Sequence, residues 1–222
     1  MTRLAIYDLD ETITRRPTFA RWLLFWAARR APWRLPLLSV QGLATLAFIG
    51  GLVGRRRLKM LGIDLVMGED AAREAVEAEA EAFVARELRT NALAGALASI
   101  AADRADGCRL VLATASMDFY ADAFARALKF EVAIATHSGW KGAGLRPHAA
   151  GSNCYGEEKL ARIEAWIADV GLAREQAHVR FYSDHISDHP TFAWADEAIV
   201  VNPALPLERI ARAREWRIER WN

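Results

Sequence analysis

Apolar residues in the second half of the chain fall into two alternating patterns. Short apolar runs of strand length occupy residues 109–114, 131–135, 178–183, 197–201 and, more briefly, 216–218. Between them, apolar residues recur every three or four positions over residues 118–129, 157–170, 188–195 and 206–214, which predicts helices. Residues 137–147 contain four glycines or prolines and are expected to form a loop or hairpin. Strictly alternating strands and helices predict a parallel sheet with right-handed crossovers.

The first half of the chain contains a single strand signal, at residues 3–8. A long region without strand signals follows, with helical periodicity from about residue 17 and a charged amphipathic run over residues 69–88. The first strand must therefore join the sheet across a helical insertion. We expect an α/β fold with a Rossmann-like parallel core, formed by residues 1–15 and 107–222, and an inserted all-helical cap formed by residues 16–106.

Composition narrows the functional classes only slightly. A chain of 222 residues suits one domain with a sizeable insertion, and its net charge of +1 gives no general attraction to nucleic acid. Cys108 and Cys154 are too few for a secreted disulfide framework. Because the amino terminus runs directly into the first strand, no cleavable signal sequence is expected. We expect both thiols to be reduced. The protein is expected in the cytoplasm, with the inner face of the membrane as an alternative location.

One stretch argues for membrane contact. Residues 35–54 carry no charge, have arginines on both sides, and follow a segment rich in tryptophan (Trp22, Trp26 and Trp33). The length matches a membrane span, but Pro36 and several glycines lower its helix propensity. A single span would also separate the first strand from the later ones. The open alternatives are a re-entrant or interfacial hairpin and a buried helical core.

The strongest chemical signal is Asp8-Leu9-Asp10-Glu11-Thr12, directly after the first strand. Side chains alternate along a strand, so Asp8 and Asp10 can reach one pocket at the carboxyl edge of the sheet while Leu9 points into the core. Two such close carboxylates repel unless a cation or a proton is shared. This predicts a divalent metal, one ionised carboxylate acting as nucleophile, and a second that carries a proton.

Three later segments extend the pattern. The strand at 109–114 ends in small hydroxyl residues, Thr114 and Ser116; Lys159 lies in the first turn of the helix at 157–170; and the strand at 178–183 is followed by Asp184 and Asp188. The order and spacing of the four segments resemble the haloacid dehalogenase superfamily of aspartate-nucleophile phosphohydrolases. Within it, they are similar to the branch that contains phosphoserine phosphatases and bacterial phosphatidylglycerophosphate phosphatases.

The resemblance implies a role for each motif. Asp8 would be the nucleophile, Asp10 the general acid and base, and Thr114 a hydrogen-bond donor to a phosphoryl oxygen, with Ser116 as the neighbouring alternative. Lys159 would offset charge in the transition state. Substrate-binding candidates are Thr12, Ser116, Arg15 and Arg16. Glu11 departs from the glycine that is frequent at its position, so the tight turn that glycine allows is not expected.

The same resemblance implies magnesium, because the candidate ligands are hard oxygen donors. They are the Asp8 carboxylate, the Asp10 backbone carbonyl and Asp184, with Asp188 binding through water or orienting the lysine. His185 and His189 raise zinc as an alternative, but no cysteine and histidine spacing supports it.

The expected activity is magnesium-dependent hydrolysis of a phosphomonoester through an aspartyl phosphate. Arginines after the first motif favour an anionic or lipid-linked substrate, with peripheral membrane contact through the cap. The alternatives are a phosphoserine phosphatase-like metabolite phosphatase, a phosphoryl-transfer mutase and a non-enzymatic receiver-like domain. No nucleic acid partner is expected, and the sequence leaves the oligomeric state open.

Overall fold

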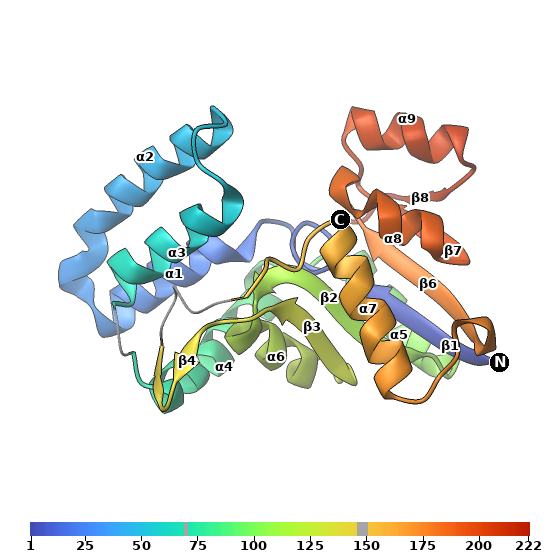
Figure 1. Ribbon diagram of the computed structural model, residues 1–222, viewed down its shortest axis with the longest axis horizontal. Helices are drawn as coiled ribbons and strands as arrows, with labels where there is room; N and C mark the ends of the chain where they lie inside the picture. The colour runs from blue at the N-terminus through green and yellow to red at the C-terminus, as the bar shows by residue number, and fades with distance from the viewer. Residues whose placement is uncertain (69–70, 146–150) are drawn as a thin grey trace.

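The fold is built on one six-stranded parallel sheet (Figure 1). The computed structural model describes residues 1–68, 71–145 and 151–222. The strands are β1 (Thr2–Tyr7), β2 (Arg109–Met117), β3 (Val132–Thr136), β6 (Ala177–Ser183), β7 (Glu197–Val201) and β8 (Arg217–Glu219). Their order across the sheet is β3-β2-β1-β6-β7-β8, so β1 is a central strand. This confirms the predicted parallel α/β core.

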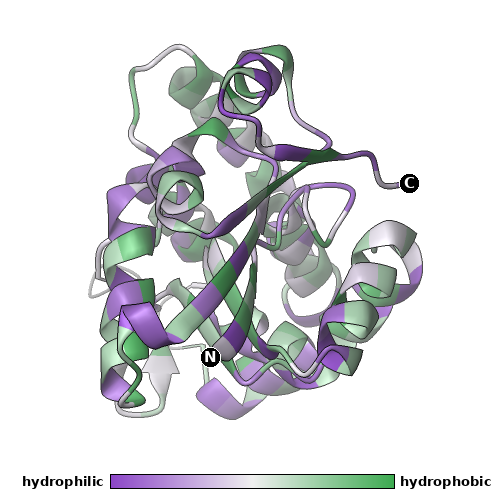
Figure 2. Ribbon diagram, turned by 90° about the vertical axis from the view of Figure 1, so that its right-hand side faces the viewer, coloured by the Kyte–Doolittle hydropathy of each residue, from purple (hydrophilic) through white to green (hydrophobic). Residues whose placement is uncertain are grey.

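Helices cover both faces of the sheet, as Figure 2 shows from the side. The two-residue period of β1 divides its side chains between two cores. Leu4 and Ile6 pack with apolar side chains of α7, α8 and α9, whereas Ala5 and Tyr7 pack with those of α4, α5 and α6. The helices beside the sheet are α4 (Arg73–Thr90), α5 (Ala94–Ala105), α6 (Asp118–Ala127), α7 (Glu157–Asp169), α8 (His189–Trp194) and α9 (Leu205–Ala213).

Most predicted elements lie within a few residues of the observed ones. The exception is β2, which runs to Met117 past the expected end; the helix expected at 188–195 is α8, preceded by a 3₁₀ turn (Ile186–Asp188). The expected hairpin forms from β4 (Trp140–Lys141) and β5 (Gly144–Leu145). Residues 146–147 of that segment, and 69–70 of the predicted amphipathic run, lie outside the described residues.

Three helices of the insertion stand to one side of the sheet, at the left of Figure 1. They are α1 (Thr18–Arg30), α2 (Leu38–Ile49) and α3 (Arg55–Val66), with a 3₁₀ segment (Pro32–Leu37) between the first two. The next two helices make different contacts: α4 packs along α6, and α5 packs on β2. The limits of the cap at residues 16 and 106 stay a prediction.

Aromatic packing connects α1 to the elements beside the sheet. The Trp22 ring lies 5.4 Å from Phe83 of α4 and 5.1 Å from Phe119 of α6, measured between ring centroids. Trp22 and Trp26 are buried in this cluster, whereas Trp33 is exposed. The tryptophans thus divide between core and surface.

The uncharged run at 35–54 is not one continuous helix. It forms the end of the 3₁₀ segment, then α2, then a turn before α3. No helix in the described ranges is long and apolar enough to cross a membrane.

Candidate active site

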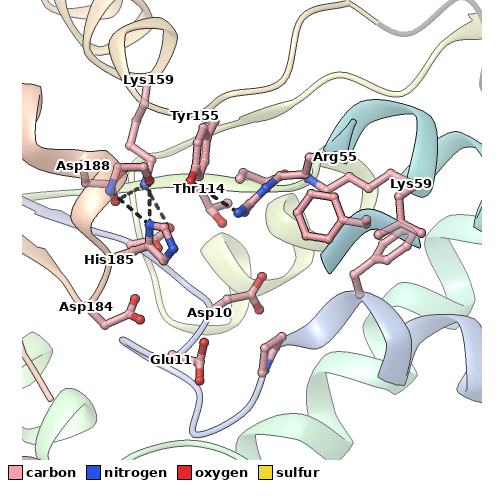
Figure 3. Close-up of a pocket in the computed structure, with 17 residues that line it drawn as sticks. Asp10, Glu11, Arg55, Lys59, Thr114, Tyr155, Lys159, Asp184, His185 and Asp188 are labelled. Atoms are coloured by element: carbon pink, nitrogen blue, oxygen red, sulfur yellow. Dashed lines mark hydrogen bonds and ion pairs between the residues drawn. The ribbon is translucent and has the colours of Figure 1, made fainter. Parts of the chain in front are cut away.

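A cavity of about 300 Å³ lies where β1, β2 and β6 reach the carboxyl edge of the sheet (Figure 3). Parallel strands bring their carboxyl ends together, so segments far apart in sequence meet here. Six residues predicted from the sequence line the cavity: Asp8, Asp10, Thr114, Lys159, Asp184 and Asp188. Leu9, between the first two aspartates, is fully buried in the core, as the alternation predicted.

Lys159 forms the charged centre of the site. Its Nζ lies 2.6 Å from Asp188 Oδ2 and 3.2 Å from Asp8 Oδ1. Ser183 donates a second hydrogen bond, of 2.7 Å, to Asp188 Oδ2. Burial alone would lower the pKa of Lys159, but the carboxylates of Asp188 and Asp8 raise it above its ordinary value. Lys159 is therefore a fixed cation, and Asp188 orients it.

Asp8 and Asp184 are held in an environment that disfavours their charge. Burial and the nearby Asp188 and Asp10 outweigh the attraction of Lys159 and raise the pKa of Asp8 to about 6. Burial, with the charges of Asp8 and Glu11, raises the pKa of Asp184 to about 8. The protein thus gathers more carboxylate charge than its own cations balance.

Asp10, also in the lining of the cavity, is fixed by three hydrogen bonds. The backbone N–H and the hydroxyl of Thr18 each donate to Asp10 Oδ1 at 2.7 Å, and Ser116 Oγ donates to Asp10 Oδ2 at 2.8 Å. Thr18 is the first residue of α1. The position of the second aspartate therefore depends on both the sheet and the first helix of the insertion.

The turn after Asp10 differs from expectation. Glu11 adopts φ 59°, the left-handed conformation that favours glycine. The sequence-based expectation that the tight turn would not form without glycine was wrong. The turn forms with glutamate at this position, and the backbone of Glu11 is strained.

Two predicted substrate-binding residues instead contact carboxylates of the site. Thr12 Oγ1 donates to Asp184 Oδ1 at 3.2 Å, and Ser116 donates to Asp10. Neither is among the residues that line the cavity. Thr114 does line it, and its Oγ1 accepts from the Ser116 N–H at 3.1 Å, which leaves the Thr114 hydroxyl proton free to donate.

The donor set fits a magnesium ion. Asp8 Oδ1 is buried and lacks a hydrogen-bond donor in the described part of the chain, although Lys159 is within ion-pair distance. No three acidic, histidine or cysteine side chains of the described residues converge on one point. A cation here would be held by Asp8, Asp184 and the Asp10 carbonyl, completed by water, which are the oxygen ligands that magnesium prefers.

Comparison with known proteins agrees with this arrangement. The model of the haloacid dehalogenase-like hydrolase family matches residues 5–193. The chain belongs to this family. Protein CicA of Caulobacter vibrioides is 30% identical over 205 residues, covering 87% of this chain and 83% of CicA. The predicted superfamily is thereby confirmed, and membership of a hydrolase family decides against the receiver-like alternative.

Solved structures share the fold of this hydrolase. A Bordetella pertussis protein of unknown function superposes with a TM-score of 0.85 at 24% identity, covering 98% of both chains. A phospho-aspartyl intermediate analogue of phosphoserine phosphatase superposes with a TM-score of 0.65 at 16% identity, covering 98% of this chain and 92% of that one. The predicted resemblance to phosphoserine phosphatase is confirmed for the fold.

Two arginines predicted to meet the substrate of this hydrolase lie elsewhere. Arg15 and Arg16 are exposed and do not line the cavity; their backbone groups bond with Asn91. Arg21, the next arginine along, forms an ion pair with Glu87 of α4. Proximity to the first motif in sequence did not place these side chains at the site.

Besides Lys159, the cavity is lined by two basic residues of α3 that were not predicted from the sequence, Arg55 and Lys59 (Figure 3). The Arg55 guanidinium lies 4.2 Å from the Tyr155 ring centroid. Lys59 Nζ donates to the Ala115 carbonyl and, at 2.8 Å, to Asn153 Oδ1. The sequence contained a usable signal, because residues four apart share one face of a helix.

Lys59 is a buried cation of a different kind from Lys159. Burial, assisted by Arg55, lowers the pKa of Lys59 to about 8, because no carboxylate bonds it directly. Its two acceptors are a backbone carbonyl of β2 and a neutral amide. Asn153 thus holds a side chain from α3.

Proposed function

We propose that the protein is a magnesium-dependent phosphomonoester hydrolase that acts through an aspartyl phosphate on Asp8. The observation that carries this proposal is the buried Asp8 Oδ1, which accepts no hydrogen bond from the described residues and lies beside Lys159, in the same cavity as Asp10. A carboxylate with an unused oxygen next to a fixed cation is suited to attack a phosphorus centre.

The chemistry proceeds in two displacements. An Asp8 oxygen attacks phosphorus, the bond from phosphorus to the ester oxygen breaks, and protonated Asp10 gives its proton to the leaving alkoxide. Asp10, now ionised, takes a proton from water as the water oxygen attacks the aspartyl phosphate. Inorganic phosphate leaves and the Asp8 carboxylate is restored. Ser116 and Thr18 keep Asp10 in place for both proton transfers.

Cations balance the charge of the phosphoryl group in both steps. Lys159 lies against Asp8 throughout, and the Thr114 hydroxyl is available to a phosphoryl oxygen. When bound, magnesium supplies positive charge to the nucleophile and the transferring phosphoryl group.

The lining of the cavity favours an anionic substrate with an apolar part. Arg55 and Lys59 place two basic groups on α3, and Phe19, Phe48 and Leu58 add apolar surface. We therefore propose a lipid-linked or similarly amphipathic phosphomonoester, acted on at the inner face of the membrane. An amino-acid phosphate is the second candidate, favoured by the likeness in fold to phosphoserine phosphatase.

Substitution of Asp8 tests the chemistry. Asp8→Asn should reduce hydrolysis of an aryl phosphate by several orders of magnitude without loss of fold, because the amide has the same shape and cannot attack phosphorus. Asp106→Asn, an exposed substitution outside the cavity, is the matched control. Chelation should abolish turnover, and added magnesium should restore it.

Trapping the intermediate identifies the nucleophile. Beryllium trifluoride with magnesium should form its adduct on Asp8 in the native protein and not in Asp8→Asn. An adduct on Asp10 or Asp184, or full turnover in excess chelator, would contradict the proposal. Comparing phosphatidyl and phosphoserine substrates then decides between the two candidate classes.

A further inference from the structure

The outer face of α2 is apolar, exposed and without a partner in the described structure. Leu43, Leu46 and Ile49 are 67%, 65% and 73% exposed and, with Val40, recur every three residues along one side of the helix. Leu52, in the turn that follows, and Trp33, in the 3₁₀ segment before α2, are also exposed. We call these six residues the α2 face. A monomeric protein rarely exposes so continuous an apolar stripe without using it.

The segment of chain that contains the α2 face is basic. Between Thr12 and Ile63 the sequence contains nine arginines and one lysine and no aspartate or glutamate. Two glutamates of α4 offset part of this charge, since Glu87 pairs with Arg21 and Glu79 pairs with Arg29 and Arg30. Basic residues also lie at both ends of the apolar stripe, with Arg34 before α2 and Arg55 and its neighbours at the start of α3.

We infer that the α2 face binds the surface of an anionic lipid bilayer. Apolar side chains flanked by arginines match a membrane interface, where the former enter the acyl boundary and the latter meet phosphate oxygens. A second copy of this chain fits less well, because two α2 faces in contact would bring two arginine clusters together.

The length of α2 sets its orientation. Twelve residues span about 18 Å, well short of the roughly 30 Å of a hydrocarbon core, so the helix lies along the interface. Exposed Trp33 suits the headgroup level, which tryptophan prefers.

The helix that carries the α2 face also reaches the catalytic cavity. Phe48, on the same helix, lines the cavity, and the Arg55 guanidinium lies 5.7 Å from its ring centroid. Contact between α2 and a bilayer would bring the site to the depth of lipid headgroups. The binding itself does not depend on the proposed hydrolase activity.

Vesicle sedimentation of the full chain tests the inference. The protein should bind vesicles of phosphatidylcholine with added phosphatidylglycerol, bind pure phosphatidylcholine poorly, and lose affinity as salt is raised. The double variant L43E and L46E should weaken binding by at least about tenfold, because two carboxylates would have to enter the acyl boundary. L205E is the matched control, since Leu205 is 70% exposed at the start of α9, at the other end of the molecule (Figure 1).

The outcomes separate this inference from the proposed function. The double variant should retain hydrolysis of a small aryl phosphate, because neither leucine lines the cavity. Absence of vesicle binding, equal binding to neutral and anionic vesicles, or equal losses in the double variant and L205E would overturn the inference. So would a concentration-dependent dimer that the double variant abolishes, because the α2 face would then belong to a second copy.

Discussion

Two buried lysines line one cavity, and their different neighbours give them different chemistry. Lys159 is held between two carboxylates, which keep it charged, whereas Lys59 bonds neutral oxygens. Only the second has a pKa near the physiological range. Activity should therefore depend on pH through the lysine of α3 and not through the lysine of α7.

The pH profile of kcat/KM tests this difference. Below about pH 8 the Lys59 ammonium is charged and attracts an anionic substrate; above it the proton is lost, so kcat/KM should fall as pH rises through that value. Lys59→Met should lower kcat/KM at neutral pH and remove this alkaline limb. Lys59→Arg should keep the charge and move the limb to higher pH. If the fall in kcat/KM at alkaline pH is unchanged in Lys59→Met, another group is responsible for it. Lys129→Met, at an exposed position, is the control for the loss of one positive charge.

Glu11 and Gly156 show how single backbone conformations shape the site. Glu11, between Asp10 and Thr12, adopts φ 59°. The strained backbone therefore lies directly beside two residues of the site. Gly156 precedes α7 with φ 60° and ψ −132°, a region essentially restricted to glycine. It allows the chain to turn so that Lys159 points back toward Asp8.

At the scale of elements, the start of α7 is the part of the site most sensitive to backbone geometry. Gly156→Ala should cost about 1–3 kcal/mol of folding stability and displace Lys159, so both Tm and kcat should fall. Gly42→Ala in α2 is the matched control: an added Cβ would meet no heavy atom within 4 Å, and alanine favours a helix. Equal melting temperatures for Gly156→Ala and the native protein would contradict the assigned role of this turn.

Strands and motifs were predictable because their signals are local. The run before Asp8 is apolar and short, and a carboxylate that follows such a strand must lie at the edge of a parallel sheet. These local signals were enough to bring Asp8, Thr114, Lys159 and Asp184 to one edge of the sheet, where all four line the cavity. What they do in catalysis stays a prediction.

The contribution of α3 was not predictable in the same way. Helical periodicity shows that residues 55 and 59 share a face, but not which face turns toward the sheet, because that depends on the packing of α1, α2 and α3. For the same reason Arg15 and Arg16, expected at the substrate, do not line the cavity. Closeness in sequence to Asp10 does not fix the direction of a side chain. Long-range packing of the insertion therefore decides which basic residues reach the cavity.

At the scale of the whole molecule, the insertion is connected to the rest by buried charge as well as by aromatic packing. Glu87 of α4 is almost fully buried and accepts hydrogen bonds of 2.7 and 2.8 Å from Arg21 of α1 and one of 2.7 Å from Asn91. A buried carboxylate whose two oxygens both accept hydrogen bonds stabilises the positions of the donor side chains.

Removal of that charge should loosen the connection. Glu87→Gln should lower the free energy of unfolding by about 1–3 kcal/mol, because the Arg21 guanidinium loses its charged partner in a part-buried place. Glu81→Gln, in the same helix, removes an ion pair with Arg126 in which both side chains are about half exposed, and should cost no more than about 0.5 kcal/mol. Chemical denaturation of both variants measures the difference; similar losses would show that burial of the pair is unimportant.

The central position of β1 has a consequence for how the chain is made. β1 pairs with β2 across the whole insertion and with β6 still further along, so Leu4 lies opposite Arg109 and Val179. Contacts at such separation form slowly, because long loops must close first. A nascent chain released by the ribosome only as far as residue 170 would expose one edge of β1 and carry Asp8 without Asp184 or Asp188. Until synthesis passes these residues the emerging chain has an open sheet edge and no active site, and it is in this interval that it most needs a chaperone.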